Sequence, residues 1–293
     1  MEIKVASTAG FCFGVSRAVE TVYRYIEEHP GQKIYTCGPI VHNEQVVEDL
    51  SAKGVSVIAD DAGLDRLIRD GALKDAAVII RAHGIGSDIR EKLESVNGIC
   101  VIDATCPYVT KIHEVVRKAY EKGDMIVITG DPDHPEVKGI MGCVGGNAAV
   151  IADTLDAERF SCPEGRRITL VSQTTFNVRK FEDIVEIFKK KMYIVSIVNT
   201  ICNATQRRQS EAAALSRECD VMLVVGGSNS SNTAKLFEIC RSECQATYYI
   251  RCLDDLSRVA IGNSVRCIGI TAGASTPKTI IEEVLNYVRT EFW

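Results

Sequence analysis

The chain has 293 residues, of which 46% are hydrophobic and 25% are charged, and its formal net charge is −5. This composition is typical of a globular protein with one large or two to three ordinary cores. The charges are dispersed without a basic stripe, which argues against a nucleic-acid partner. The sequence has neither a signal-peptide pattern nor an apolar run of membrane-spanning length, so we expect a cytoplasmic protein that does not associate with membranes.

β-like apolar runs alternate with amphipathic helical patterns from one end of the chain to the other. The first run, 3–6, precedes Cys12, and helical spacing of apolar residues follows it over 15–26. Further β-like runs lie at 34–37, 77–80, 100–104, 125–129, 168–172, 193–198, 221–225 and 265–271. Further helical patterns lie at 109–120, 181–190 and 279–288. This alternation predicts parallel sheets covered by helices, an α/β fold.

Three cysteines, Cys12, Cys106 and Cys202, occur at nearly equal intervals. Each one follows a β-like run and precedes a helical pattern, as a diverged internal triplication would leave. We therefore expect three pseudo-symmetric α/β lobes with small, mostly parallel sheets around a central cavity. The expected lobes are residues 13–105, residues 106–198, and residues 199–288 completed by the N-terminal strand in 1–12.

Two polar turns recur in each expected lobe, each after a β-like run. The first set contains the residues around His42, around His134 and Glu136, and at Ser230, Ser231 and Asn232. The second set contains the residues around His83, Thr174 and Ser275. Ligands of parallel α/β sheets gather outside the carboxyl ends of the strands. We therefore expect the cysteines and the turns to form one site in the central cavity.

The three cysteines stand where a helix is expected to start, and the positive end of the helix dipole favours thiolate there. Three thiolates suit an iron–sulfur cluster in which one iron lacks a protein ligand. Zinc held by three cysteines and a histidine, and the absence of any metal, stay open as alternatives. The nine other cysteines are expected to be small buried hydrophobes: Cys37, Cys100, Cys143, Cys162, Cys219, Cys240, Cys244, Cys252 and Cys267.

The side chains of the turns favour an anionic ligand and a proton donor. Imidazoles, hydroxyls, an amide and helix N-termini together can hold a phosphate or diphosphate without lysine. Glu136 is the carboxylate among these turns and would donate a proton if burial raises its pKa. The alternative is a glutamate that only stabilises a helix start. Thr174 would orient the proton, or would only cap the next helix.

Read in order, the motifs resemble those of the 4-hydroxy-3-methylbut-2-enyl diphosphate reductases over nearly the whole chain. The motifs are GFCFGVSRAV, IVHN, RAHG, DATCPYVTKIH, HPEVKGIMG, SQTT, TIC, GSNSSN and TAGAST. The resemblance implies an oxidoreductase of isoprene biosynthesis by the non-mevalonate pathway. It also implies one 4Fe-4S cluster per chain, held by Cys12, Cys106 and Cys202, with one iron that lacks a protein thiolate.

The resemblance further implies a reaction and the roles of the residues. The reaction is the two-electron reductive dehydroxylation of 4-hydroxy-3-methylbut-2-enyl diphosphate to isopentenyl and dimethylallyl diphosphate. Catalysis is expected from Glu136, Thr174 and His134. The expected substrate-binding residues are His42, His83, His134, Thr174, Ser230, Ser231, Asn232 and Ser275. An electron donor such as ferredoxin or flavodoxin is the expected protein partner, and the chain is expected to be a monomer.

Two other functions fit part of the pattern. A hydro-lyase would eliminate water from a hydroxy acid without an external reductant, and Arg81, Arg207 and Arg208 would serve its carboxylate substrate. A non-enzymatic iron–sulfur sensor would lose its cluster to change partner binding, but the sequence has no recognition helix or basic patch.

Overall fold

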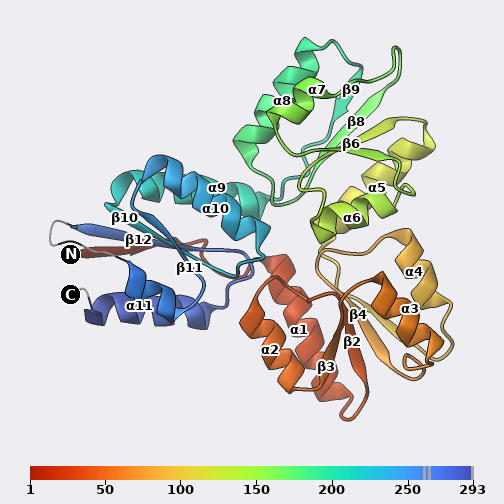
Figure 1. Cartoon of the computed structure of the whole chain (residues 1–293), viewed down its shortest axis with the longest axis horizontal. Helices are drawn as coiled ribbons and strands as arrows, with labels where there is room; N and C mark the ends of the chain where they lie inside the picture. The colour runs from red at the N-terminus through yellow and green to blue at the C-terminus, as the bar shows by residue number, and fades with distance from the viewer. Residues whose placement is uncertain (260–261, 263–264, 292–293) are drawn as a thin grey trace. The chain divides into compact units, whose positions relative to one another are not determined.

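The computed structural model describes residues 1–259, 262 and 265–291, in which helices alternate with strands (Figure 1). Within these residues the strands form three four-stranded sheets, and every pair of neighbouring strands is parallel. The predicted α/β class with small parallel sheets is thereby confirmed. The chain divides into two compact units, described in turn below. The first comprises Met1–Val15, His42–Val46 and Cys202–Trp293, and the second comprises Ser16–Val41 and Val47–Ile201.

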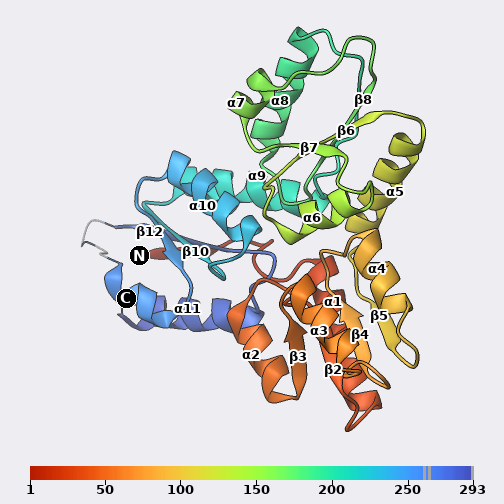
Figure 2. The same ribbon diagram turned by 45° about the vertical axis from the view of Figure 1, so that its right-hand side comes forward.

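The sheet of the first unit has the order β11-β10-β12-β1. Its strands are β1 (Glu2–Val5), β10 (Val221–Val225), β11 (Thr247–Ile250) and β12 (Cys267–Ala272). The helices α9 (Asn203–Glu218) and α10 (Ser231–Glu243) cover one face, and α11 (Lys278–Glu291) covers the other (Figure 2). The short helix η1 (Leu253–Arg258) follows β11. Leu223 packs toward Val284 of α11, whereas Met222 packs toward Leu236 of α10. Burial on both faces explains why β10 is a continuous apolar run.

The second unit contains a sheet of order β3-β2-β4-β5. Its strands are β2 (Ile34–Cys37), β3 (Val55–Ile58), β4 (Ala77–Ile80) and β5 (Cys100–Asp103). The helices around it are α1 (Phe13–Glu28), α2 (Glu44–Ala52), α3 (Asp61–Arg69) and α4 (Ser87–Glu94). Leu64 of α3 and Leu93 of α4 pack with Val78 of β4. The turn that follows β4 therefore starts from a strand held by a buried core.

The other sheet of the second unit has the order β7-β6-β8-β9. Its strands are β6 (Met125–Thr129), β7 (Ala148–Ile151), β8 (Ile168–Ser172) and β9 (Val195–Ile197). The helices α5 (Pro107–Glu121) and α6 (Pro135–Gly142) cover one face, and α7 (Thr154–Arg159) and α8 (Val178–Lys190) cover the other (Figure 1). Ile128 packs with Ile140 of α6, and Leu170 packs with Phe188 of α8.

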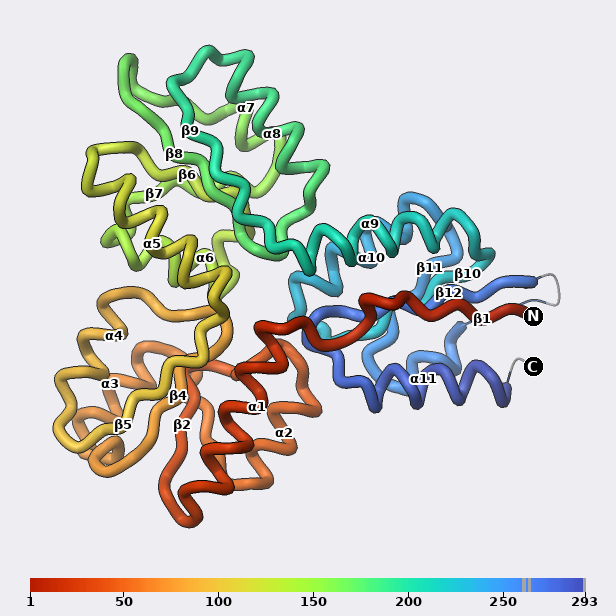
Figure 3. The backbone as a smooth tube through the Cα atoms, turned by 180° about the vertical axis from the view of Figure 1, so that it is seen from behind, coloured from red at the N-terminus to blue at the C-terminus, as the bar shows by residue number. Residues whose placement is uncertain are grey.

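All three sheets share one topology. The second position in the sheet is held by β2, by β6 and by β10, and the strand that follows each of these in the chain occupies the first position. The fourth position is held by β5, by β9 and by the N-terminal strand β1, which pairs with β12 from Glu2↔Cys267 to Val5↔Ile270 (Figure 3). The N-terminal strand thus completes the sheet formed by the C-terminal part of the chain. The lobe boundaries at 13–105, 106–198 and 199–288 stay a prediction.

Each predicted polar turn follows the carboxyl end of a strand, because β2, β4, β6, β8, β10 and β12 all end directly before one. The prediction that the nine other cysteines are buried is wrong for Cys100 and Cys252, which are exposed, and for Cys143 and Cys162, which are half-buried. Cys100 starts the edge strand β5, and Cys252 lies between β11 and the short helix η1. No helix among the described residues has both the length and the apolar character that crossing a membrane requires.

Candidate functional site

A buried carboxyl group lies at the start of α6 in the second unit. Glu136 is 1% exposed. Its two oxygens accept hydrogen bonds from Thr174, one from the backbone N–H (2.6 Å) and one from the hydroxyl (2.7 Å). Thr174 follows β8, and α6 follows β6, its neighbour in the sheet, so the parallel register brings the two residues together. The predicted pairing of Glu136 with Thr174 is thus present, although it does not by itself assign a role.

Burial raises the pKa of Glu136 from its ordinary value of 4.5 to about 7, against the opposing effect of the two hydrogen bonds from Thr174. Removal from water disfavours the charged form of a carboxyl group. Its position at a helix start and the donors of Thr174 favour the charged form. Because burial dominates, the pKa of this carboxyl group lies near neutral pH.

The raised pKa makes a prediction about stability. A group whose pKa is higher in the folded than in the unfolded chain contributes stability below the unfolded pKa and loses it as pH rises through the folded pKa. The contribution of Glu136 is therefore expected to disappear between about pH 4.5 and pH 7. It amounts to at most about 3 kcal/mol. Urea denaturation at pH 5 and pH 8 should show a smaller pH dependence for Glu136→Gln than for the wild type, and equal dependences would contradict the assigned pKa.

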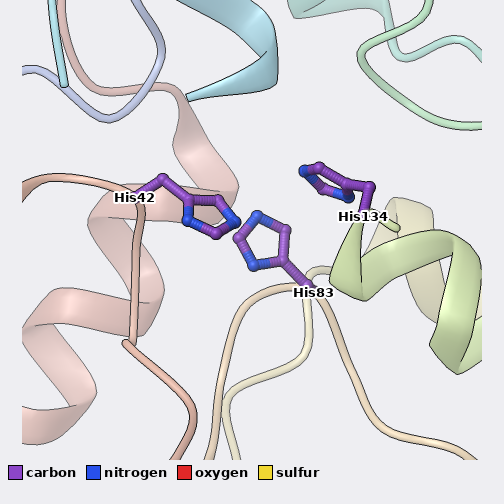
Figure 4. A group of neighbouring side chains, drawn as sticks. All are labelled: His42, His83 and His134. Carbon is purple, nitrogen blue, oxygen red and sulfur yellow. The ribbon is translucent and has the colours of Figure 1, made fainter. Parts of the chain in front are cut away.

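Two predicted histidines of the second unit face each other. The rings of His83 and His134 make an edge-to-face contact, with centroids 5.2 Å apart and an angle of 88° (Figure 4). His83 comes from the turn after β4, and His134 precedes α6 as its N-cap. The Nδ1 atom of His134 accepts a hydrogen bond from the backbone N–H of Glu136 at 3.1 Å. That contact leaves Nε2 of His134 as the ring nitrogen that carries the proton in the neutral form.

A further histidine, His113, packs against the segments that carry His83 and His134. It is buried on α5, and burial together with Arg117 lowers its pKa to about 4, so the ring is neutral. A Cβ atom placed on Gly84 would lie 2.9 Å from its Cε1 atom, and one placed on Gly139 would lie 3.7 Å from its Nε2 atom. The imidazole thus packs against the turn that carries His83 and against the helix that follows His134. The one signal for this packing is the position of His113 among the buried residues of α5.

Gly84 permits a test of this packing. Its φ of +70° is strained for other residues, and an added Cβ would collide with His113. Gly84→Ala is expected to destabilise the protein by about 3 kcal/mol, of which left-handed strain accounts for about 1 kcal/mol. Gly123→Ala is the matched control, because Gly123 has a φ of +85° but open space around it. Equal losses in thermal or urea denaturation would show that His113 does not constrain the turn.

In the first unit, five of the predicted substrate-binding residues lie on neighbouring turns. The hydroxyl of Ser275 donates to the carbonyl oxygen of His42 (2.9 Å) and lies 3.4 Å from the hydroxyl of Ser230. Ser230 caps α10 by accepting the N–H of Thr233. Asn232, in the first turn of α10, accepts the N–H of Ala274 at 3.0 Å, which joins the turns after β10 and β12. Ser231 is the first residue of α10.

This group offers donors to an anion. The side-chain nitrogen of Asn232 is buried and has no hydrogen-bond partner among the described residues. Such a group is costly to bury, so it is suited to a polar ligand. The start of α10 adds backbone N–H groups and the positive end of a helix dipole.

A glycine that the sequence reasoning did not single out permits the approach of His42 to these turns. A Cβ atom on Gly227 would lie 2.8 Å from the carbonyl oxygen of His42 and 2.7 Å from a carboxylate oxygen of Glu44. Ser228 contributes to the same contact, because its hydroxyl donates a hydrogen bond to the carboxylate of Glu44 at 2.7 Å. In the sequence, the signal for this close approach is the Gly-Ser pair at the start of the motif GSNSSN.

Two of the three cysteines share a buried arginine in the first unit. The guanidinium of Arg208, on α9, donates to the carbonyl oxygens of Gly10 (2.7 Å) and Ala272 (2.5 Å). Burial lowers the pKa of Arg208, and the nearby thiols of Cys12 and Cys202 oppose this effect. Arg208 thus places a buried positive charge beside these two cysteines. Cys202 also caps α9, since its sulfur accepts the N–H of Thr205 at 3.4 Å.

Cys106 occupies the same kind of position in the second unit. It is the N-cap of α5 and is followed by Pro107, and its backbone N–H donates to the carbonyl oxygen of Ala82 at 2.9 Å. This bond joins the cysteine to the RAHG turn that carries His83. Like Cys12 and Cys202, Cys106 is half-buried and is not in a disulfide.

The arginines of the hydro-lyase alternative lie in different environments. Arg208 is engaged by backbone carbonyl oxygens, as described above. Arg81 lines a cavity of about 630 Å³ together with Asp61 and Lys138. Burial lowers the pKa of Arg81, and Cys37 and Asp61 oppose this effect. The Nε atom of Arg81 has no hydrogen-bond partner among the described residues, and Arg207 is exposed.

Comparison with known proteins gives full-length matches. Residues 3–289 match the family model described as LytB protein. A 4-hydroxy-3-methylbut-2-enyl diphosphate reductase of Caldanaerobacter subterraneus subsp. tengcongensis is 45% identical over 291 residues, which cover 99% of this chain and 97% of the relative. The enzyme of the same name from Clostridium perfringens strain 13 is 41% identical, with 97% of each chain covered.

Two solved structures are similar as well. The E-1-hydroxy-2-methyl-but-2-enyl-4-diphosphate reductase of Plasmodium falciparum has a TM-score of 0.90 at 29% identity, covering 99% of this chain and 88% of that one. A structure of (E)-4-hydroxy-3-methyl-but-2-enyl diphosphate reductase, described as the terminal enzyme of the non-mevalonate pathway, has a TM-score of 0.65 at 36% identity. It covers 99% of both chains.

The parallel α/β fold and these matches define an oxidoreductase. The chain belongs to the LytB protein family. The resemblance seen in the sequence motifs is thereby confirmed.

Proposed function

We propose that this protein catalyses the two-electron reductive dehydroxylation of 4-hydroxy-3-methylbut-2-enyl diphosphate to isopentenyl and dimethylallyl diphosphate. The names of the full-length relatives support this substrate. The observation that carries the reaction type is the buried Glu136 carboxyl held by Thr174, because a reductive loss of hydroxyl needs a proton source inside the site. In the overall reaction, one allylic alcohol takes up two electrons and two protons and gives one dehydroxylated alkene and one water.

The proposed cofactor is one 4Fe-4S cluster per chain, held by Cys12, Cys106 and Cys202. The donor set fits this group, since none of the three cysteines is in a disulfide, each directly precedes a helix, and Arg208 lies beside two of them. When bound, such a cluster supplies electron transfer and one Lewis-acidic iron that lacks a protein thiolate. Zinc would need the same thiolates but would carry no electrons.

The chain's own residues would bind the substrate and move protons. The imidazoles of His42, His83 and His134 and the polar groups of Ser230, Ser231, Asn232 and Ser275 would hold the diphosphate. Glu136 would donate the proton that leaves with the hydroxyl as water, and the hydroxyl of Thr174 would orient the carboxyl group. His134 would fix the start of α6 through its bond to the Glu136 backbone.

The proposed partners are small molecules and one redox protein. An electron donor such as ferredoxin or flavodoxin would supply the two electrons, and the protein would act as a cytoplasmic monomer. The ratio of the two products would depend on which end of the allylic fragment receives the second proton.

The experiment that tests the proposal is anaerobic spectroscopy with and without substrate. Protein purified without oxygen should contain about four irons per chain and absorb broadly in the visible. The absorption should change when the allylic diphosphate is added, and a strong reductant should allow its consumption. A colourless, zinc-loaded protein would end the cluster assignment, and turnover without a reductant would favour a hydro-lyase.

The proton donor also predicts a pH profile for this reaction. Because Glu136 is protonated below its pKa of about 7, turnover at saturating substrate is expected to fall as pH rises through 7 to 8. The loss should approach tenfold for each pH unit above the pKa. Steady-state rates between pH 6 and pH 9 check this, and a rate that stays flat to pH 9 would exclude a titrating Glu136.

A further inference from the structure

Two cysteine thiols that the proposed reaction does not use touch each other in the first unit. Cys219 directly follows α9 as its C-cap, and Cys267 is the first residue of β12. Their sulfur atoms are 3.0 Å apart, and neither is in a disulfide. Both residues are largely buried, with exposed fractions of 8% and 7%.

The backbone holds these two residues in place on both sides of the contact. The N–H of Asp220 donates to the carbonyl oxygen of Cys267 (3.0 Å), and the N–H of Cys267 donates to the carboxylate of Asp220 (3.0 Å). The next residues pair directly, since Val221 and Ile268 are partners between β10 and β12. The meeting of the two sulfurs is therefore set by the sheet.

The neighbouring glycine leaves room for this contact. A Cβ atom on Gly269 would lie 3.0 Å from the sulfur of Cys219 and 2.4 Å from the sulfur of Met222. Any other residue at this position would displace the thiol of Cys219 from its place beside Cys267.

The other cysteines of the same core have different partners. The thiol of Cys244 lies 3.6 Å from the carbonyl oxygen of Cys219 and 3.5 Å from that of Asp220. Cys240 is fully buried on α10. These two behave as the small core hydrophobes that the sequence predicts. Cys219 and Cys267 belong to the same core cluster, and each adjoins an exposed residue in the chain, Glu218 and Arg266 respectively.

We propose that Cys219 and Cys267 form a redox modification site that low-molecular-weight disulfides convert to an intramolecular disulfide. The sulfurs need to approach by about 1 Å to reach the disulfide bond length of about 2.05 Å. The thiolate of one cysteine attacks the small disulfide, forms a mixed disulfide and expels one small thiolate. The thiolate of the second cysteine attacks the protein-bound sulfur and expels the other.

The reaction balances in electrons and protons. The protein dithiol loses two electrons, the small disulfide is reduced to two thiols, and the two protons of the protein thiols end on them. The new bond joins residues 48 positions apart and ties the end of α9, the helix that starts after Cys202, to the strand that pairs with β1. Closing a loop of this length stabilises the folded chain, so oxidation raises the Tm by a few degrees.

The test is peptide mapping of the anaerobically purified full-length protein after exposure to oxidised glutathione. The incubation is done at mildly alkaline pH, because burial and the neighbouring thiol of Cys267 raise the pKa of Cys219 and the thiolate is the nucleophile. After an acid quench, alkylation and digestion, mass spectrometry should find the peptides of Cys219 and Cys267 joined. Iron content measured in parallel separates this reaction from any loss of a cluster.

Variants distinguish the pair from its neighbours. The Cys240→Ser variant should retain the link, whereas Cys267→Ser should stop at a mixed disulfide on Cys219 and lose the reversible rise in Tm. Recovery of Cys219 and Cys267 as separately alkylated peptides, or a link from Cys219 to Cys244, would overturn the proposal. If Cys267→Ser fails to fold by circular dichroism, the wild-type map alone decides.

Discussion

Replacing Glu136 by glutamine is expected to slow turnover by about a hundredfold or more, with little change in substrate affinity. Glutamine keeps the size of the side chain and one acceptor for Thr174, but it has no acidic proton to donate. The effect should therefore appear in kcat and leave KM nearly unchanged. Rates measured under anaerobic conditions with a chemical reductant check this, because the electron donor is then not limiting.

The control for this variant is Glu121→Gln, an exposed glutamate at the end of α5 in the same unit. It makes the same Glu→Gln replacement at a position where no proton transfer is proposed, so the turnover rate of this variant should match that of the wild type. Iron content and visible absorption should be equal in all three proteins. A Glu136→Gln enzyme with full activity would mean that another group delivers the proton, and loss of iron in that variant would point to a structural role.

The second large effect is expected from the proposed ligands. Replacing Cys106 or Cys202 by serine should remove most of the iron and the visible absorption and lower turnover by more than about a hundredfold, because a hydroxyl is a poor replacement for thiolate at iron. The measurement is iron per chain together with the absorption spectrum. Both variants should fold, since neither cysteine belongs to a core cluster of the described residues.

Cys162→Ser is the matched control, because Cys162 is also half-buried and is not in a disulfide. Its sulfur lies 3.8 Å from the carbonyl oxygen of Arg166. This variant should keep its iron and its activity. Retention of full iron by both Cys106→Ser and Cys202→Ser would refute the assigned ligand set.

The central strands were predictable to the residue because buried parallel strands are continuous apolar runs bounded by polar turns. β2, β4, β6, β8 and β10 begin and end where the sequence pattern places them. The edge strands β3, β7 and β11 were not predicted. Each is only four residues long and partly exposed, so its pattern is too weak to distinguish from a loop.

The sequence by itself determined the α/β class, the motif order that indicates the family, and the residue types of the candidate site. These follow from local periodicity and from the chemistry of single side chains. Only the tertiary structure decided the burial of Glu136 and its two bonds from Thr174, the packing of His113 under two turns, and the place of Arg208 beside Cys12 and Cys202. The reason is physical: a pKa and a contact depend on neighbours that the fold brings from distant parts of the chain, and no local pattern encodes them.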